Sequence, residues 1–293
     1  MVNQKEAENL RALGMQYKDI AEKLGCSVGW CKANLKHVFV TSKKGSLVSG
    51  AKYITRLNGG LIVVEDRGWD SVAVQFIGTG TEVIARRADV VAGIVKDYYK
   101  PSVFGVGFVG VGAFRHTESD GVTPTRYSVA WRGMLRRCYD ANFQRKRLTY
   151  SECTVDPKWH NFQEFALWAA GQAFEPGWEI DKDILVQFNK HYSPETCCFV
   201  PQRVNTLLTH IKCTNGELPF GVQRDVTGTL FHAYCHDGSA QVYAGTSKTP
   251  EGAFELYVLA KEAMFKAVAD EHKDSLEVGV YEALYNRKVT ING

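Results

Sequence analysis

The chain has 293 residues, enough for two or more small domains. It contains 45% hydrophobic, 23% charged and 12% aromatic residues, as ordinary globular proteins do, and its net charge of +3 suits a cytosolic enzyme as well as a nucleic-acid binder. No window approaches the run of about 18 apolar residues that crosses a membrane. The polar N-terminus leads into no hydrophobic signal core. We therefore expect a cytoplasmic protein without a membrane partner.

The positive charge is patchy rather than uniform. Residues 115–147 hold eight lysines and arginines against three acids, and the first fifty residues hold eight against four. The eight cysteines include no Cys-x-x-Cys pair. Cys197 and Cys198 are adjacent, and Cys26 and Cys31 lie in a helical segment far from any second ligand pair. We expect buried, reduced thiols and no structural zinc.

Residues 4–38 read as three short helices, separated at Gly14 and Gly25, with Ser27 as the N-cap of the third. The segment resembles the helix-turn-helix family in the run Ile20-Ala21-x-x-Leu24-Gly25-Cys26-Ser27. The resemblance implies that the third helix enters a DNA groove with a set of small and cationic residues: Ser27, Gly29, Lys32, Ala33 and Lys36. The alternative is a three-helix packing module with a solvated lysine face.

After a linker at residues 43–46, residues 46–96 alternate short apolar runs with glycine turns. They predict a compact β module, for which a small barrel is one arrangement, and they carry no recognisable chemistry. The glycine-dense segment 101–112 spells a dinucleotide fingerprint, Gly105-x-Gly107-x-x-Gly110. A polar loop follows it instead of a helix, so we expect a glycine-rich β-hairpin and no nucleotide site.

Residues 127–211 carry an ordered series of landmarks: Trp131-x-x-Met134-x-x-Arg137-Cys138, Trp159-His160-x-Phe162-x-x-Phe165-x-x-Trp168, Asp181-Lys182-Asp183-Ile184 and Tyr192-Ser193-Pro194-Glu195-Thr196-Cys197. This order resembles phage HNH-type endonucleases, including homing-type enzymes. The resemblance implies a helical lead-in and a finger of two strands and a helix that holds one divalent metal ion, Mg²⁺ or Mn²⁺.

The finger is matched with 179–184 as the first strand, 198–201 as the second and 203–211 as the helix. On this match Asp181 keeps the metal-side acid and Asn205 the last position, while Lys182 replaces the general-base histidine and Thr196 the middle asparagine. A lysine beside two carboxylates should stay protonated. Asp183 shares a strand face with Asp181 and is a second metal ligand, and His191 is a substitute base.

The lead-in predicts an amphipathic helix that buries Trp131, Met134, Leu135 and Cys138 and exposes a cationic side, Arg132, Arg136 and Arg137. That side suits a phosphate backbone. The aromatic residues at 159–168 recur every three residues and predict one further helix with a buried aromatic face, although base stacking is an alternative.

Residues 221–224, 228–234 and 241–246 predict three antiparallel strands, and Thr249 begins a helix that runs to about His272. This pattern is similar to the AP2 DNA-binding domain, in which the exposed sheet face reads the major groove. The resemblance makes Gln223, Arg224, Gln241 and Tyr243 the reading residues, and it places Phe231, Ala233 and Cys235 where that family more usually has charged residues. The alternative is a small α+β packing domain.

The sequence thus predicts an α+β multidomain protein with four parts, namely 1–42, 46–100, 101–215 and 216–293. The leading hypothesis is a phage-type protein that binds double-stranded DNA in the cytoplasm of an infected bacterium and cuts it with Asp181, Asp183, Asn205 and a metal ion. The rival is a DNA-binding regulator or host-interaction protein whose finger does not cut. An RNA-binding protein built on the same basic helix is a third reading.

Overall fold

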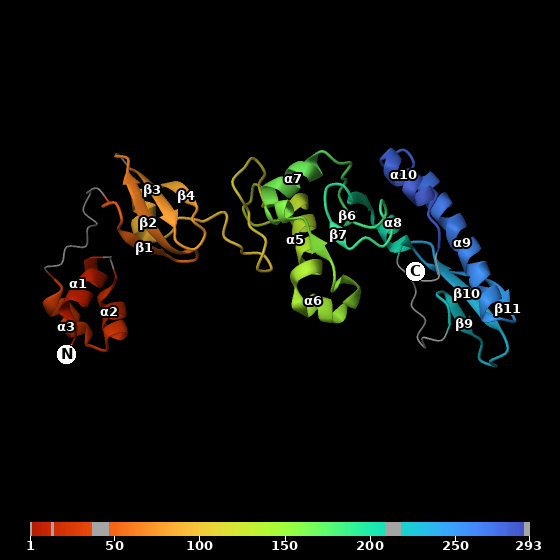
Figure 1. Cartoon of the computed structure of the whole chain (residues 1–293), viewed down its shortest axis with the longest axis horizontal. Coiled ribbons are helices and arrows are strands. Elements are labelled where there is room, and N and C mark those ends of the chain that lie inside the picture. Colours follow the sequence, from red (N-terminus) through yellow and green to blue (C-terminus); the bar gives the residue numbers. More distant parts are fainter. Residues whose placement is uncertain (1, 13–14, 37–46, 69, 209–217, 290–293) are drawn as a thin grey trace. The chain divides into compact units, whose positions relative to one another are not determined.

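The computed structural model describes residues 2–12, 15–36, 47–68, 70–208 and 218–289 (Figure 1). The chain mixes helices with antiparallel strands, in agreement with the expected α+β class. It divides into two compact units, residues 1–100 and 101–293. Within the described ranges, no helix is long and apolar enough to cross a membrane.

The first unit begins with three short helices, α1 (Gln4–Ala12), α2 (Tyr17–Leu24) and α3 (Val28–Asn34). Gly25 ends α2 in the left-handed region (φ 63°), which glycine adopts without strain. The Ser27 hydroxyl accepts a hydrogen bond from the Trp30 amide at 3.0 Å and begins α3, as predicted. The predicted continuation of this helix is wrong at Leu35 and Lys36, which lie in a turn, and the rest of it, with Val38 and the linker at 43–46, falls outside the described residues.

The same unit contains a four-stranded antiparallel sheet in the order β1 (Lys52–Thr55), β2 (Gly59–Asp66), β3 (Ser71–Phe76) and β4 (Glu82–Arg86), followed by α4 (Arg87–Ala92). One face buries the apolar residues of the alternating runs, among them Leu61, Val63, Val72, Val74 and Phe76. The predicted strands are therefore present, as a meander of neighbouring hairpins.

The second unit opens with the glycine-dense segment, which packs on α5 (Arg126–Tyr139). A side chain at Gly107 would collide with Trp131 and Leu135, so glycine permits the close approach. The segment forms two isolated bridges, Val103 with Gly107 and Phe108 with Asn161, and the chain then runs without regular structure to α5, apart from a bridge between Thr117 and Pro124. The predicted β-hairpin is therefore wrong as a regular element, because residues 101–112 contain isolated bridges and no strand, and no helix follows them directly.

Helix α5 buries the predicted apolar face, Trp131, Met134, Leu135 and Cys138. It is followed by α6 (Ala141–Lys146), the 3₁₀ turns η1 (Leu148–Tyr150) and η2 (Pro157–His160), and α7 (Phe162–Ala170). The prediction of one helix through residues 159–168 is wrong. The Asn161 side chain accepts from the Gln163 amide at 3.0 Å and starts α7 after Trp159, which lies in η2. The aromatic side chains are nevertheless buried together.

Strand β6 (Trp178–Asp181) pairs antiparallel with β8 (Cys198–Pro201), and α8 (Gln202–Leu207) follows directly. A third short strand, β7 (His191–Tyr192), pairs with β5 (Thr154–Val155). The two strands and helix of the predicted finger therefore occur in order. The first strand is shorter than predicted, because the Asp181 carboxylate accepts from the amides of Asp183 and Ile184, both at 2.8 Å, and turns the chain.

The last part contains a three-stranded antiparallel sheet in the order β11 (Gln241–Ser247), β10 (Phe231–His236) and β9 (Val222–Arg224). It is packed on α9 (Pro250–Glu271), which Thr249 caps as predicted. Helix α10 (Val278–Tyr285) was not predicted. Side chains of α8, α9 and α10 share one core, in which Leu207, Phe265 and Leu284 are buried.

Candidate nucleic-acid interface

The Asp181 side chain ends β6 and is only partly accessible to solvent. Burial, followed by the negative charge of Asp183, raises its pKa to about 6, although the two amide hydrogen bonds that stabilise the carboxylate oppose the rise. Because β6 ends at this residue, Asp183 does not lie on the strand. The prediction that the two carboxylates share a strand face is therefore wrong.

The Asp183 carboxylate is paired with two cations. Its Oδ2 accepts from Lys182 Nζ at 3.1 Å, and its Oδ1 lies 3.5 Å from Arg287 Nη2. The Arg287 guanidinium, 7% exposed, also donates from Nη1 to the Asp183 carbonyl at 2.9 Å. Burial opposes the charge of Lys182, but Asp183 outweighs it and raises the lysine pKa overall. Lys182, which the resemblance places where the general-base histidine is usual, is therefore expected to remain protonated near neutral pH.

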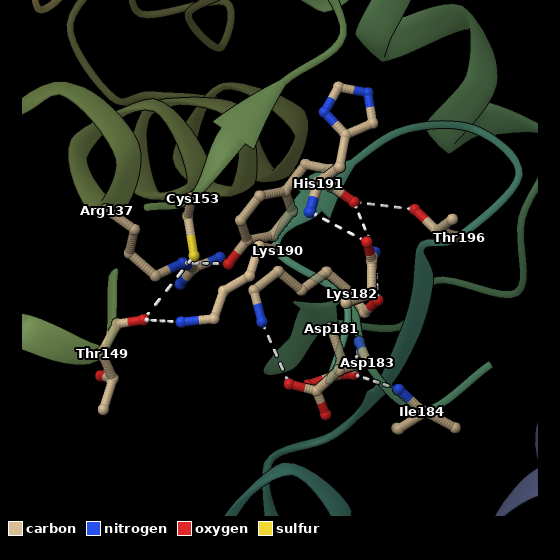
Figure 2. Close-up of polar contacts among 12 residues, drawn as sticks. Arg137, Thr149, Cys153, Asp181, Lys182, Asp183, Ile184, Lys190, His191 and Thr196 are labelled. Carbon is tan, nitrogen blue, oxygen red and sulfur yellow. Dashed lines mark hydrogen bonds and ion pairs between the residues drawn. The ribbon is translucent and has the colours of Figure 1, made fainter. Parts of the chain in front are cut away.

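Two other predicted site residues, Asn205 and His191, contact partners other than Asp181 and Asp183. Asn205, on α8, donates from Nδ2 to a carboxylate oxygen of Glu179. His191, on β7, has Nδ1 2.8 Å from the Thr154 hydroxyl. Figure 2 shows its ring directed away from the carboxylates of Asp181 and Asp183. Thr196 donates to the His191 carbonyl at 2.9 Å and holds the loop backbone.

These partners decide whether the metal ion that the resemblance implies fits the residues. One proposed ligand, Asp183, is neutralised by two cations, and the amide nitrogen of Asn205 is held by Glu179. No three His, Cys, Asp or Glu side chains gather as ligands in the described part of the chain. Asp181, Asp183 and Asn205 therefore do not form the expected ligand set in this arrangement, and no hydrolytic step follows from it.

A cluster of positive charge lies beside this loop. The ends of Arg137, Lys182 and Lys190 point toward one region beside the Cys153 sulfur (Figure 2). All three cations favour the thiolate of Cys153 electrostatically, although burial keeps its pKa raised. We call these three residues the cation cluster. They come from α5, from the turn after β6 and from the residue before β7.

Arg137 differs from the other two cations because it has no carboxylate partner among the described residues. Its Nε donates to the Tyr192 hydroxyl at 3.0 Å and its Nη2 to the Ile180 carbonyl at 3.5 Å. Lys182 is paired with Asp183, and Lys190 with Glu152 at 3.5 Å. Arg137 thus turns from α5 toward the finger and places its charge against neutral oxygens only.

The other two arginines of the predicted basic side are exposed on α5. Arg136 lies 3.6 Å from Asp140, one turn on, and its guanidinium lies over the Phe143 ring. Arg132 has no side-chain hydrogen bond or ion pair with any described residue. A cationic helix surface is therefore present, although only two of the three predicted arginines belong to it.

The predicted groove-facing residues of the first unit are all exposed. Ser27, Gly29, Lys32 and Ala33 lie at the start or on the outer side of α3. Lys36 lies in the turn after the helix, which ends at Asn34. The Ser27 hydroxyl also caps the helix, so it is already committed to one hydrogen bond.

The sheet of the last part has one face against α9 and one open face. Phe231, Ala233 and Cys235 of β10 are buried against the helix, so the alternate residues lie on the open face. The register with β9 and β11 adds further polar and aromatic residues. The open face therefore comprises Gln223, His232, Tyr234, His236, Gln241, Tyr243 and Thr246.

Three of the four predicted reading residues lie on this open face, and the fourth does not. Arg224 pairs with Phe231, so its side chain belongs to the helix side, where its guanidinium lies 5.0 Å from the Phe231 ring centroid. The aromatic rings of His232, Tyr234 and Tyr243 contact one another, with centroids 5.6 to 6.4 Å apart. The match of Phe231, Ala233 and Cys235 to the charged positions of a reading sheet is therefore wrong, because all three are buried against α9; their apolar alternation in the sequence is the signal that identifies the buried face.

Several residues at these sites were not found from the sequence. Lys190, Glu179 and Arg287 have no motif of their own, and Arg287 lies 104 residues from its partner Asp183. The one indication in the sequence that Lys190 belongs to the cation cluster is its position directly before His191, inside the segment that resembles the finger.

The chain matches no family model, no curated protein and no solved structure.

Proposed function

We propose that this protein binds duplex DNA and that its finger holds a backbone phosphate without cutting the strand. The observation that carries the proposal is the cation cluster, in which the Arg137 guanidinium has no carboxylate partner. A phosphodiester supplies the anion that this guanidinium lacks, and arginine is well suited to bind it with two parallel hydrogen bonds.

The chemistry of Lys182 supports binding over hydrolysis. A general base accepts a proton from water near neutral pH, whereas the pKa of Lys182 is raised above its already high ordinary value by Asp183. An ammonium group attracts a phosphate but does not activate water. The residue that replaces the family's histidine therefore suits phosphate binding.

Three exposed surfaces support DNA as the partner. They are the outer side of α3 with Lys32, the α5 surface with Arg132, and the open face of the last sheet with Gln241. The first two offer positive charge for phosphates, and the third offers amide and aromatic groups for base edges. Together they supply both kinds of contact that a duplex requires.

The test measures binding of a labelled random-sequence duplex by fluorescence anisotropy over a range of salt concentrations. Affinity should fall as salt rises, and Lys190→Ala should reduce the slope of log affinity against log salt by about one. Lys288→Ala is the matched control, because Lys288 is also a solvent-accessible lysine paired with a glutamate. Equal effects of the two variants, or salt-independent affinity, would contradict the proposal. An excess of structured RNA should compete less well than duplex DNA.

A second candidate, metal-dependent cleavage, is favoured by one observation. Glu179 and Asp181 alternate on β6 and so share a face, and Asn205 contacts Glu179. Nicking of supercoiled plasmid with Mg²⁺ or Mn²⁺ distinguishes the two candidates. We expect no nicking by the natural chain. Nicking that Asp181→Ala abolishes would replace the binding proposal with cleavage, and Lys182→His shows whether a restored imidazole is sufficient for cleavage.

A further inference from the structure

Two cysteine sulfurs are in contact at the start of α3. The Sγ atoms of Cys26 and Cys31 lie 3.5 Å apart, although both residues are free thiols. Cys26 lies between the glycine that ends α2 and the serine that caps α3, and Cys31 lies one turn inside the helix. The pair therefore spans the N-cap of the candidate recognition helix.

The backbone holds both cysteines in place. The Cys26 amide donates to the Ala21 carbonyl at 3.0 Å, and the Cys31 amide donates to the Ser27 carbonyl at 3.2 Å. A disulfide needs its sulfurs about 2.05 Å apart. Bond formation therefore requires the sulfurs to move about 1.5 Å closer, a shift of the size that rotation about the two Cα–Cβ bonds provides.

The two thiols differ in access. Cys31 is 0% exposed within the core of the three helices, whereas Cys26 is only partly buried. Burial, followed by the hydrogen bond and charge of Cys26, raises the pKa of Cys31. Cys26 is therefore the thiol that an external reagent reaches first, and Cys31 is placed to resolve the product.

We propose that Cys26 and Cys31 form a redox-modification site, a dithiol that low-molecular-weight disulfides such as oxidised glutathione convert reversibly into an intramolecular disulfide. The Cys26 thiolate attacks one glutathione sulfur, the glutathione disulfide bond breaks, and one glutathione thiolate leaves. Cys31 then loses its proton to solvent and attacks the Cys26 sulfur, which releases the second glutathione. Two protein thiols are oxidised by two electrons, and one glutathione disulfide is reduced to two thiols.

This chemistry does not depend on the proposed function. The new bond would tie the turn before α3 to the first turn of the helix, on either side of Ser27. Any effect on DNA affinity rests on the proposed function. The chemical step has its own readout, so the two proposals can fail separately.

The sequence permits a direct measurement on the full chain. Trypsin cleaves after Lys23 and Lys32, so both cysteines fall in one peptide, residues 24–32. The native chain is equilibrated with mixtures of oxidised and reduced glutathione and then unfolded in urea in the presence of iodoacetamide, so that exposed and buried thiols are both blocked at once. The chain is digested and the peptide masses are measured by mass spectrometry. We expect an unblocked peptide lighter by two hydrogen atoms, whose share rises with the oxidised fraction and disappears after reduction. It should form faster at higher pH, because Cys31 must deprotonate.

Two variants separate the steps. Cys31→Ala should retain one glutathione on residue 26, because the resolving thiol is absent, and Cys26→Ser should leave the buried Cys31 unmodified. Cys235→Ser is the control, since Cys235 is buried elsewhere and contacts a methionine sulfur. A peptide that stays doubly blocked in the native chain, while urea-unfolded chain forms the bond, would overturn the proposal. A glutathione adduct on Cys31 in Cys26→Ser would also overturn the order of attack.

Discussion

The finger (residues 178–207) and the last sheet (residues 222–247) were both matched to families from their sequence patterns, yet the match specified side-chain positions much better in the sheet. In the sheet, three of four predicted residues lie on the open face. In the finger, the strands and helix occur in order, but the predicted residues contact other partners. Strand alternation decides a face locally, whereas ion pairs and hydrogen bonds depend on which distant segments are packed nearby.

The largest expected effect concerns Lys261, which joins the two regions. This lysine of α9, 1% exposed, donates from Nζ to the carbonyls of Leu207 at 2.5 Å and His236 at 2.7 Å. Burial lowers its pKa from 10.5 to about 8. The unfolded chain therefore binds this proton more tightly than the folded chain between those values. The contribution of Lys261 to stability should rise with pH across that window, by about 3 kcal/mol at most.

The measurement is urea unfolding of the natural chain and of Lys261→Met across the same pH window. Subtracting the two free energies of unfolding removes the contributions of the cysteines and tyrosines that titrate in the same pH window. The free energy of unfolding of the natural chain, minus that of Lys261→Met, should increase as pH rises. A difference that stays flat would mean that the lysine is not desolvated at this junction.

The second effect tests whether a distant residue organises the finger. Arg287→Met removes both contacts with Asp183 and leaves a carboxylate with one cation fewer. We expect a loss of about 2 kcal/mol in the free energy of unfolding. Lys288→Met is the control, because Lys288 is 68% exposed and paired at the surface with Glu262, and it should cost less than about 0.5 kcal/mol. Equal losses would show that the finger does not depend on Arg287.

The third effect compares one carboxylate from each region. The pKa of Asp181 in the finger is raised to about 6, so its charged form destabilises the fold, and this cost appears as pH rises from about 4 to about 6. Asp181→Asn should therefore stabilise the protein above that window by about 1 kcal/mol, less than the roughly 3 kcal/mol of the full shift because water reaches the partly exposed carboxylate, and leave it unchanged below. The asparagine oxygen still accepts from the amides of Asp183 and Ile184.

Asp225, in the turn after β9, should respond in the opposite direction. The Thr227 hydroxyl and the backbone amides of the turn lower its pKa. Its charged form contributes stability that is lost as pH falls through the lowered value. Asp225→Asn should thus destabilise at neutral pH. If Asp181→Asn and Asp225→Asn changed the free energy of unfolding in the same direction at neutral pH, the two carboxylates would not differ as proposed.

The smallest effect tests the face assignment in the sheet. If the open face contacts DNA, Tyr243→Ala should weaken binding about tenfold, as loss of one base-edge contact does. Arg224→Ala should weaken it less than about twofold, because Arg224 lies on the helix side over Phe231. Anisotropy titrations of both variants against one duplex provide the measurement. A larger loss for Arg224→Ala would reverse the assignment.

The sequence by itself determined the elements whose cause is local. Ser27 and Thr249 begin helices through hydrogen bonds within three residues. The apolar alternation of Phe231, Ala233 and Cys235 is equally local and marks the buried face of β10, although the family match assigned these positions to the reading face. The sequence did not determine where β6 ends, because a strand pattern does not show that Asp181 will bond the next amides.

Only the tertiary structure decided which charges meet. Arg287 reaches Asp183 across 104 residues, and Arg137 leaves the basic side of α5 to contact Tyr192, 55 residues away. Both contacts form because packing brings distant segments together. A buried charge is unfavourable without a polar partner, so each arginine contacts the polar groups of the segment packed beside it. Helix periodicity placed Arg137 on a cationic side with Arg132 and Arg136, but packing made it part of the cation cluster.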